Sequence, residues 1–128
     1  MLLRRKRGLK ASQREAWNRD GFLVVSGLYS RKEIREAGAL LDSIWRERRR
    51  PANPLVVDTN LDGHGSRKYL RDAEDHEKST VYKLNDAYLE YPEARDLSLK
   101  AELVEILSEL VDGDVCVCNS LHFERGSQ

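Results

Sequence analysis

The chain has 128 residues, which is enough for one domain with a modest core. Charged residues make up 34% of it, but 22 basic side chains balance 22 acidic ones, so the whole chain has no positive field that would recruit nucleic acid. Its first apolar run, Met1 to Leu3, is too short for a signal peptide, and no stretch approaches the roughly 18 apolar residues of a membrane span. We therefore expect a cytoplasmic protein that binds neither nucleic acid nor membrane.

The N-terminal part of the sequence predicts an arm, a short helix and a strand. Residues 1–10 are strongly basic and are expected to form a flexible arm. The alternative is a segment for nuclear targeting or membrane-surface binding. Ser12-Gln13-Arg14-Glu15 has the pattern of a capping box, and the short helix that it opens should end at Gly21. The apolar run Phe22 to Val25 then predicts a short strand buried on both sides.

A second capping box, Ser30-Arg31-Lys32-Glu33, predicts the start of a long amphipathic helix that reaches about Arg49. Its apolar positions are spaced mostly three and four apart and form one stripe. They are Ile34, Ala37, Leu41, Ile44 and Trp45. The run Arg46 to Arg50 suits the solvated end of this helix better than a nucleic-acid patch, because cations also favour the negative end of the helix dipole.

The middle of the chain predicts extended segments and a long loop. Leu55 to Val57 suits a brief strand, and Asp58 to Ser66 is rich in turn-forming residues. That loop holds a single histidine, His64, so a solvated loop is favoured over a metal site. His76, which lies among charged residues, is also expected to be exposed. In Val81 to Leu84, alternation places Val81 and Lys83 on one side and Tyr82 and Leu84 on the other.

The following residues predict helices. Asn85 to Tyr91 should form a helical turn, and Pro92 suits the first turn of another helix. From Asp96 or Ser98 an amphipathic helix is expected, ending at a cap near Gly113. Its apolar stripe consists of Leu99, Leu103, Ile106, Leu107 and Leu110.

The last stretch, residues 114–128, reads as a strand that leads into an open Gly-Ser-Gln loop, so we expect the natural chain to continue. One face of this strand should be apolar and point to the core. It carries Val115, Val117, Asn119, Leu121 and Phe123. The other face carries Cys116 and Cys118, which we expect to be free thiols with a packing role, followed by Ser120 and His122. Alternation alone leaves open whether this face lines a ligand cavity or meets solvent.

Over about residues 10–128 this order of parts resembles the N-terminal region of the phytanoyl-CoA dioxygenase family. The resemblance rests on the DGFLVV run at 20–25, the long helix from Ser30, the extended segment around Lys83, a further helix, and the terminal NSLHFERGSQ. It implies one domain over residues 11–128, in which helices pack on an incomplete double-stranded β-helix, or jelly roll. The fold class is then α+β, truncated before the strands that bind the metal.

The resemblance also implies an activity, namely Fe(II)- and 2-oxoglutarate-dependent hydroxylation of a small organic or acyl substrate. Two histidines and one carboxylate hold the iron in such enzymes. Lys83 and Ser120 match positions that contact 2-oxoglutarate in the family, and His122 lies on the same face as Ser120, where it could add a hydrogen bond. An ordinary surface role is the alternative for Lys83, and for Ser120 and His122 a role without contact to 2-oxoglutarate is favoured.

The sequence departs from the family at the metal site. No His-x-Asp pair occurs in the chain, and the nearest approach, His122-Phe123-Glu124, falls on the strand that precedes the motif. We therefore expect these residues to bind no iron or 2-oxoglutarate tightly and to catalyse nothing alone, with a His-x-Asp pair beyond Gln128. The alternative is a small helical protein-interaction module, or a degenerate member of the family without catalysis.

Overall fold

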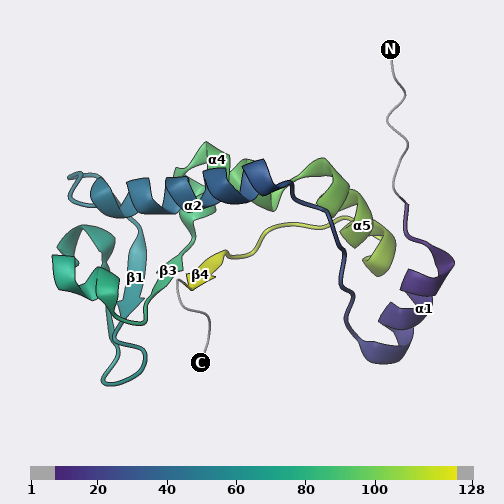
Figure 1. Ribbon diagram of the computed structural model, residues 1–128, viewed down its shortest axis with the longest axis horizontal. Helices are drawn as coiled ribbons and strands as arrows, with labels where there is room; N and C mark the ends of the chain where they lie inside the picture. Colours follow the sequence, from purple (N-terminus) through teal and green to yellow (C-terminus); the bar gives the residue numbers. More distant parts are fainter. Residues whose placement is uncertain (1–7, 124–128) are drawn as a thin grey trace, which may run out of the picture.

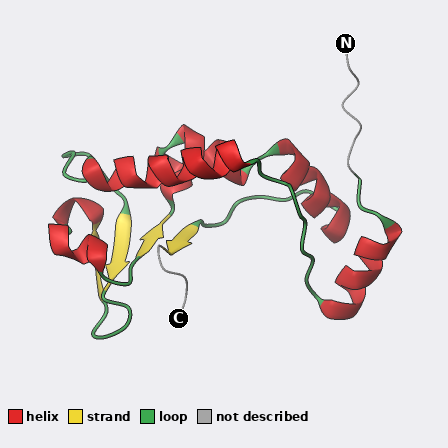
Figure 2. Ribbon diagram, in the orientation of Figure 1, coloured by secondary structure: helices red, strands yellow, loops and turns green. Residues whose placement is uncertain are grey.

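Residues 8–123 are described by a computed structural model, in which helices and one four-stranded antiparallel sheet confirm the α+β class (Figures 1 and 2). The elements in chain order are α1 (Ala11–Asp20), α2 (Arg31–Arg46), β1 (Val56–Thr59), β2 (Ser66–Tyr69), η1 (Leu70–Asp72), η2 (Asp75–Ser79), β3 (Lys83–Asn85), α3 (Ala87–Glu90), α4 (Pro92–Ser98), α5 (Ala101–Val111) and β4 (Leu121–Phe123). None of the helices within residues 8–123 is long and apolar enough to cross a membrane.

The strands lie in the order β2-β1-β3-β4, and all neighbours are antiparallel. Val57 of β1 pairs with Leu84 of β3, which in turn pairs with His122 of β4. Directly opposite residues of an antiparallel pair point to the same face. Val57, Leu84 and His122 therefore share one face of the sheet, and Asp58 and Lys83, which also pair, share the other.

The core is formed by the sheet face that carries Val57, Leu84 and His122, together with the second half of α2 and the turns of η1. Its buried members are Ile44, Trp45, Leu55, Val57, Leu70, Ala73, Tyr82, Leu84 and Ala87. The rings of Trp45 and Tyr82 meet edge to face, with centroids 4.9 Å apart, a favoured aromatic geometry. Figure 1 shows the sheet at one end of the molecule, with α2 above it, and α1 and α5 at the other end.

Several local predictions are confirmed. Ser30 and Glu33 form the expected capping box, since Ser30 Oγ accepts from the Glu33 N–H at 3.2 Å and Glu33 Oε2 accepts from the Ser30 N–H at 2.7 Å. Gly21 caps α1 in the left-handed conformation, with φ of 74°. Pro92 opens α4. Tyr82 and Leu84 are buried on one side of their segment, as alternation predicts, while Lys83 on the other side is half-buried.

The prediction of a buried strand at residues 22–25 is wrong. These residues run outside the sheet, and the side chains of Phe22 and Val24 are 63% and 75% exposed. An apolar run becomes a strand only where a partner strand accepts its backbone hydrogen bonds, and the four strands of the described sheet pair with one another instead. The capping box at Ser12 is also wrong: α1 begins at Ala11, and the Lys10 N–H donates to Gln13 Oε1 at 3.0 Å.

The apolar stripes of the two long helices are buried only in part. Within α2, Ile44 and Trp45 are buried, but Ile34 near its start is 59% exposed. The helix expected from Asp96 or Ser98 is α5, which begins later, at Ala101, because the preceding helix α4 extends to Ser98. The left-handed cap of α5 is Asp112, with φ of 52°, rather than Gly113.

Strand β2 was not predicted, and β4 is shorter than predicted. The loop expected over residues 58–66 is shorter than predicted, because β1 extends through Thr59 and β2 begins at Ser66. The sequence of β2, SRKY, has no apolar alternation, as is common for a charged edge strand. Of residues 114–123, only Leu121–Phe123 form a strand.

Pairing with β3 also reverses the expected orientation of β4. His122 lies opposite the buried Leu84, whereas Phe123 lies opposite Lys83 and Leu121 is 49% exposed. Leu121 and Phe123, which were predicted to face the core, are therefore on the other face of the sheet. Cys116 and Cys118 are free thiols, as predicted, but both are exposed and do not pack in the core.

Candidate functional site

The three predicted 2-oxoglutarate contacts do not share one face of the sheet. Lys83 lies on the face that is opposite to the core. His122 lies on the core face, with its ring 6.3 Å from that of Tyr82. Ser120 precedes β4, where its N–H donates to Asp86 Oδ1 at 2.9 Å and its carbonyl accepts from the Asp86 N–H at 2.8 Å. Ser120 and His122 thus contact Asp86 and Tyr82 of the protein itself. Contact of Lys83, Ser120 or His122 with 2-oxoglutarate stays a prediction.

Lys83 belongs to a polar group on its own face of the sheet, which we call the Asp58 cluster: Asp58, Arg67, Lys83 and Asn85. Asp58 Oδ2 lies 3.0 Å from Lys83 Nζ and accepts from Asn85 Nδ2 at 3.0 Å. Asp58 Oδ1 lies 3.3 Å from Arg67 Nε. Strand pairing produces this arrangement directly, because Arg67 and Lys83 are the two residues opposite Asp58, one in each neighbouring strand.

The charges around Asp58 keep its carboxyl group ionised, and the cluster as a whole carries more positive than negative charge. Burial alone would raise the pKa of Asp58, but hydrogen bonds from Asn85 and Lys83 and the charges of Lys83 and Arg67 outweigh it, and the net pKa is lowered. Asp58 is therefore ionised at neutral pH, and two cations face one carboxylate. A lysine ammonium has three N–H donors, so Lys83 can bind a second acceptor besides Asp58.

The surroundings of the cluster remain partly open to solvent. The side chain of Lys83 is 24% exposed and that of Arg67 is 67% exposed. On the same face Tyr69 is 48% exposed, and Phe123 lies opposite Lys83. A hollow of about 220 Å³ adjoins Asn85 between β1 and α3. This face combines aromatic and charged side chains at an accessible surface, which suits a ligand-binding wall.

The residues described do not form an iron site. Within residues 8–123, no three His, Cys, Asp or Glu side chains gather such that they could hold a metal ion. His64 and His76 are exposed in separate turns, as predicted, and His122 lies against the core. We therefore assign no step of an iron reaction to these residues.

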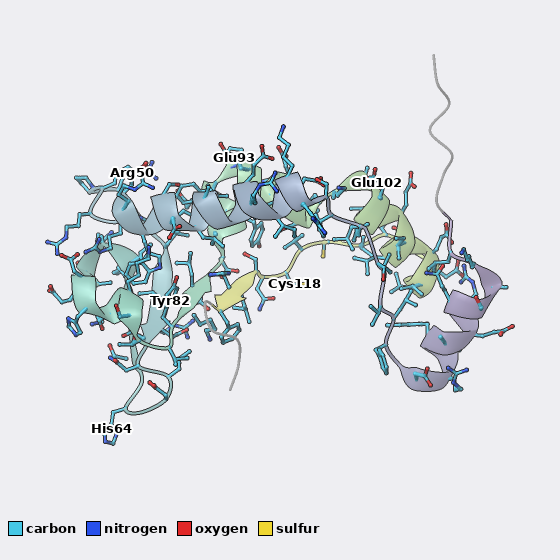
Figure 3. All side chains as sticks on the ribbon, viewed as in Figure 1. Arg50, His64, Tyr82, Glu93, Glu102 and Cys118 are labelled. Carbon is cyan, nitrogen blue, oxygen red and sulfur yellow. The ribbon has the colours of Figure 1, made fainter. Side chains whose placement is uncertain are left out.

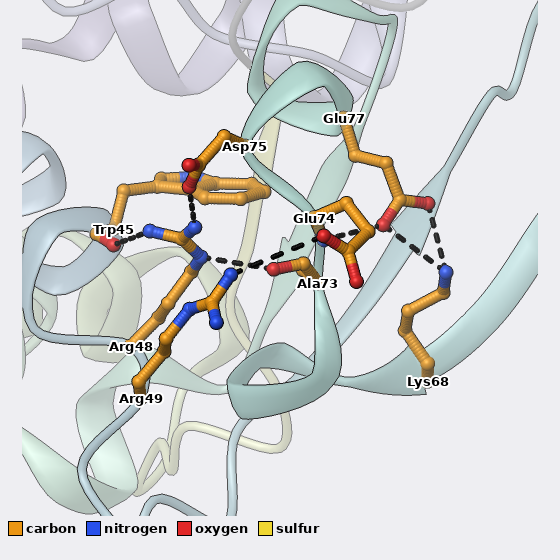
Figure 4. A network of polar contacts seen from close by, with 8 residues as sticks. All are labelled: Trp45, Arg48, Arg49, Lys68, Ala73, Glu74, Asp75 and Glu77. Atoms are coloured by element: carbon orange, nitrogen blue, oxygen red, sulfur yellow. Dashed lines mark hydrogen bonds and ion pairs between the residues drawn. The ribbon is translucent and has the colours of Figure 1, made fainter.

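The burial of two charged side chains, Arg48 and Glu77, was not predicted from the sequence, and both are drawn in Figure 4. Arg48 lies in the run that we expected to be solvated, yet it is buried, and it donates to the carbonyls of Ala73 and Trp45 and pairs with Asp75. Glu77 is 3% exposed and binds Lys68. Each tethers η1 or η2 to the rest of the core, so we interpret both as structural groups.

Comparison of the chain with models of protein families, with curated proteins and with solved structures found no match.

Proposed function

We propose that this chain is the N-terminal part of an Fe(II)- and 2-oxoglutarate-dependent dioxygenase similar to the phytanoyl-CoA dioxygenase family, acting on a small organic or acyl substrate. In this proposal the four-stranded sheet is one portion of a larger jelly roll. The face with the Asp58 cluster is then a wall of the chamber that receives 2-oxoglutarate.

The observation that carries the proposal is the position of Lys83. The resemblance places a 2-oxoglutarate contact at this lysine, and in the structure Lys83 lies on the partly open sheet face beside a second cation, Arg67. Charge-assisted hydrogen bonds from an ammonium or guanidinium to a carboxylate are stronger than neutral ones. Asp58 holds Lys83 in place while leaving part of its ammonium for a ligand.

The chemistry of oxidation would belong to the iron, whose ligands are not found within residues 8–123. The part of this chain is then to bind and orient a carboxylate. Without the iron ligands, the 128 residues are expected to hydroxylate nothing and to bind 2-oxoglutarate weakly.

We expect Lys83→Met to lower the affinity for 2-oxoglutarate about fivefold, because it removes one charge-assisted contact but keeps most of the side-chain volume. Titration of the chain with 2-oxoglutarate by isothermal calorimetry or NMR measures the change. Lys78→Met is the matched control, since Lys78 is a partly exposed lysine that is paired with Asp42 outside the Asp58 cluster. Equal affinity in the Lys83 and Lys78 variants, or no binding at about 10 mM ligand, would contradict the proposed role of Lys83.

A second experiment tests the membership of the family independently of Lys83. The coding DNA that follows the Gln128 codon can be read directly. A His-x-Asp pair within about ten codons would support the proposal, since this pair supplies two ligands of the iron triad. A continuation without such a pair, or a stop codon at once, would contradict it.

A further inference from the structure

A groove lies between α2 and α4, outside the sheet and separate from the Asp58 cluster. Its volume is about 420 Å³. Its apolar floor is formed by Ala37 and Leu40 of α2 and by Leu97 of α4. Ala37 and Leu40 are three residues apart, so they lie on one face of the helix, towards α4. The groove thus offers an apolar floor where two helices pack together.

The rim of the groove is acidic on both sides. Glu36 comes from α2, and Glu93 and Asp96 come from successive turns of α4. Figure 3 shows Glu93 on the side of the helical layer that faces away from the sheet. Glu93 and Asp96 are exposed and have no ion-pair partner within residues 8–123. Among residues 8–123, the ion-pair partner of Glu36 is Lys32, at 3.6 Å, and both side chains are largely exposed, so this pair is weak.

The groove is also lined by a cation, Lys100, whose charge is paired with the carboxylate of Glu33. Lys100 Nζ pairs with Glu33 and lies 5.0 Å from the centroid of the Tyr29 ring. Hydrogen bonds from Lys100 and from Ser30 lower the pKa of Glu33 to about 2, so Glu33 is ionised at neutral pH. The charge of Lys100 is therefore balanced locally, and the carboxylates of the rim keep their negative field.

We propose that this groove binds a basic peptide segment of a partner protein, in which lysine or arginine side chains flank an aliphatic one. The aliphatic side chain would enter the floor at Ala37, Leu40 and Leu97. The flanking cations would meet Glu36, Glu93 and Asp96. Opposite charges across an interface speed association and exclude wrong partners, and the apolar floor selects a peptide over a purely polar cation.

The test uses a fluorescein-labelled synthetic peptide with two leucines between pairs of lysine and arginine, and fluorescence anisotropy on the full chain. We expect saturable binding that weakens as salt rises from low to physiological concentration. The double variant Glu93→Gln, Asp96→Asn should raise the Kd about tenfold, since it removes both unpaired rim charges at little cost in shape. Replacing the peptide leucines with glycine should weaken binding as well.

The matched control is Glu105→Gln with Asp114→Asn, two exposed carboxylates outside the groove that change the net charge equally. Its Kd should stay within about twofold of the unaltered chain. Equal losses in the two double variants would show attraction to the general charge and would overturn the proposal. So would equal binding of a peptide with glutamate in place of its cations, or displacement by spermidine as effective as by unlabelled peptide, which would indicate a small organic cation as the occupant.

Discussion

Replacing Arg48 with methionine is expected to lower the free energy of unfolding by about 3 kcal/mol. The side chain of Arg48 is 11% exposed, and its Nε and Nη1 donate to the carbonyls of Ala73 and Trp45, each at 3.0 Å. Methionine fills a similar volume but has no donor, so both carbonyls lose their bond to this side chain. Its partner Asp75 is 87% exposed and regains water, so the cost arises at the carbonyls rather than at the ion pair.

Urea denaturation followed by circular dichroism measures this loss. The neighbouring arginine provides the control, because the side chain of Arg49 is 65% exposed and lies 3.9 Å from Glu74, also exposed. Arg49→Met should change the unfolding free energy by no more than about 0.5 kcal/mol. If both variants lose the same stability, the interpretation of Arg48 as a buried structural group is wrong.

Glu77→Gln is expected to destabilise the fold by a similar amount, about 3 kcal/mol at neutral pH. Glu77 Oε1 accepts from Thr59 Oγ1 at 2.7 Å and from Lys68 Nζ at 2.9 Å, and Oε2 accepts from the Glu74 N–H at 2.8 Å. Glutamine keeps one acceptor oxygen, but its amide nitrogen is a donor where a donor already lies. It also leaves Lys68, which is 29% exposed, without a counter-charge.

The pH dependence of unfolding separates the charge of Glu77 from its shape. Burial alone would raise its pKa, but the hydrogen bonds from Lys68, from the Glu74 N–H and from Thr59 outweigh burial and lower the pKa from 4.5 to about 2. Because the folded state binds the proton less tightly than the unfolded state, this contribution is complete above pH 4.5 and is lost as the pH falls towards 2.

We therefore expect the unaltered chain to lose more stability than Glu77→Gln when the pH is lowered from 5 to about 2.5. Thermal unfolding at a series of pH values records the difference. Glu74→Gln is the control, because the Glu74 side chain is 66% exposed and the backbone N–H that binds Glu77 is unchanged. A pH profile of Glu77→Gln parallel to that of the unaltered chain would contradict the assigned role.

The sequence predicted those parts of the fold whose causes are local. The capping box at Ser30 is set by side chains three residues apart, and Pro92 starts a helix because its ring suits the first turn. Alternation was sufficient to place Tyr82 and Leu84 on one side and Lys83 on the other, since it needs only one strand.

Features that depend on a partner distant in the sequence were not predictable in this way. The run Phe22 to Val25 has the composition of a strand, but the composition does not say whether a partner strand exists. Arg48 reads as the solvated end of a helix until η1 and η2 supply the carbonyls and the carboxylate around it. The short edge strand β2 carries no apolar signal of its own.

The same limit applies to the candidate site. Lys83 was identified from the resemblance, and its segment was expected to be extended. Its neighbours Asp58 and Arg67 could not be identified from the sequence, because only the register of three strands brings them next to Lys83. That register also decides the orientation of His122, which alternation within one strand could not settle. A predicted hairpin between residues 56 and 69 would have been the signal for Arg67.

The first helix has a consequence for how the protein opens. No residue of α1 is buried. Polar contacts of this region with α5 are made at Glu109, which accepts from the Leu9 N–H and pairs with Arg14, and the Arg14 side chain also donates to the Glu109 carbonyl. Few buried contacts mean a low free energy of local opening. Amide hydrogens of α1 should therefore exchange through fraying, while those of β1 and β3, around Val57 and Leu84, exchange only when the whole sheet unfolds.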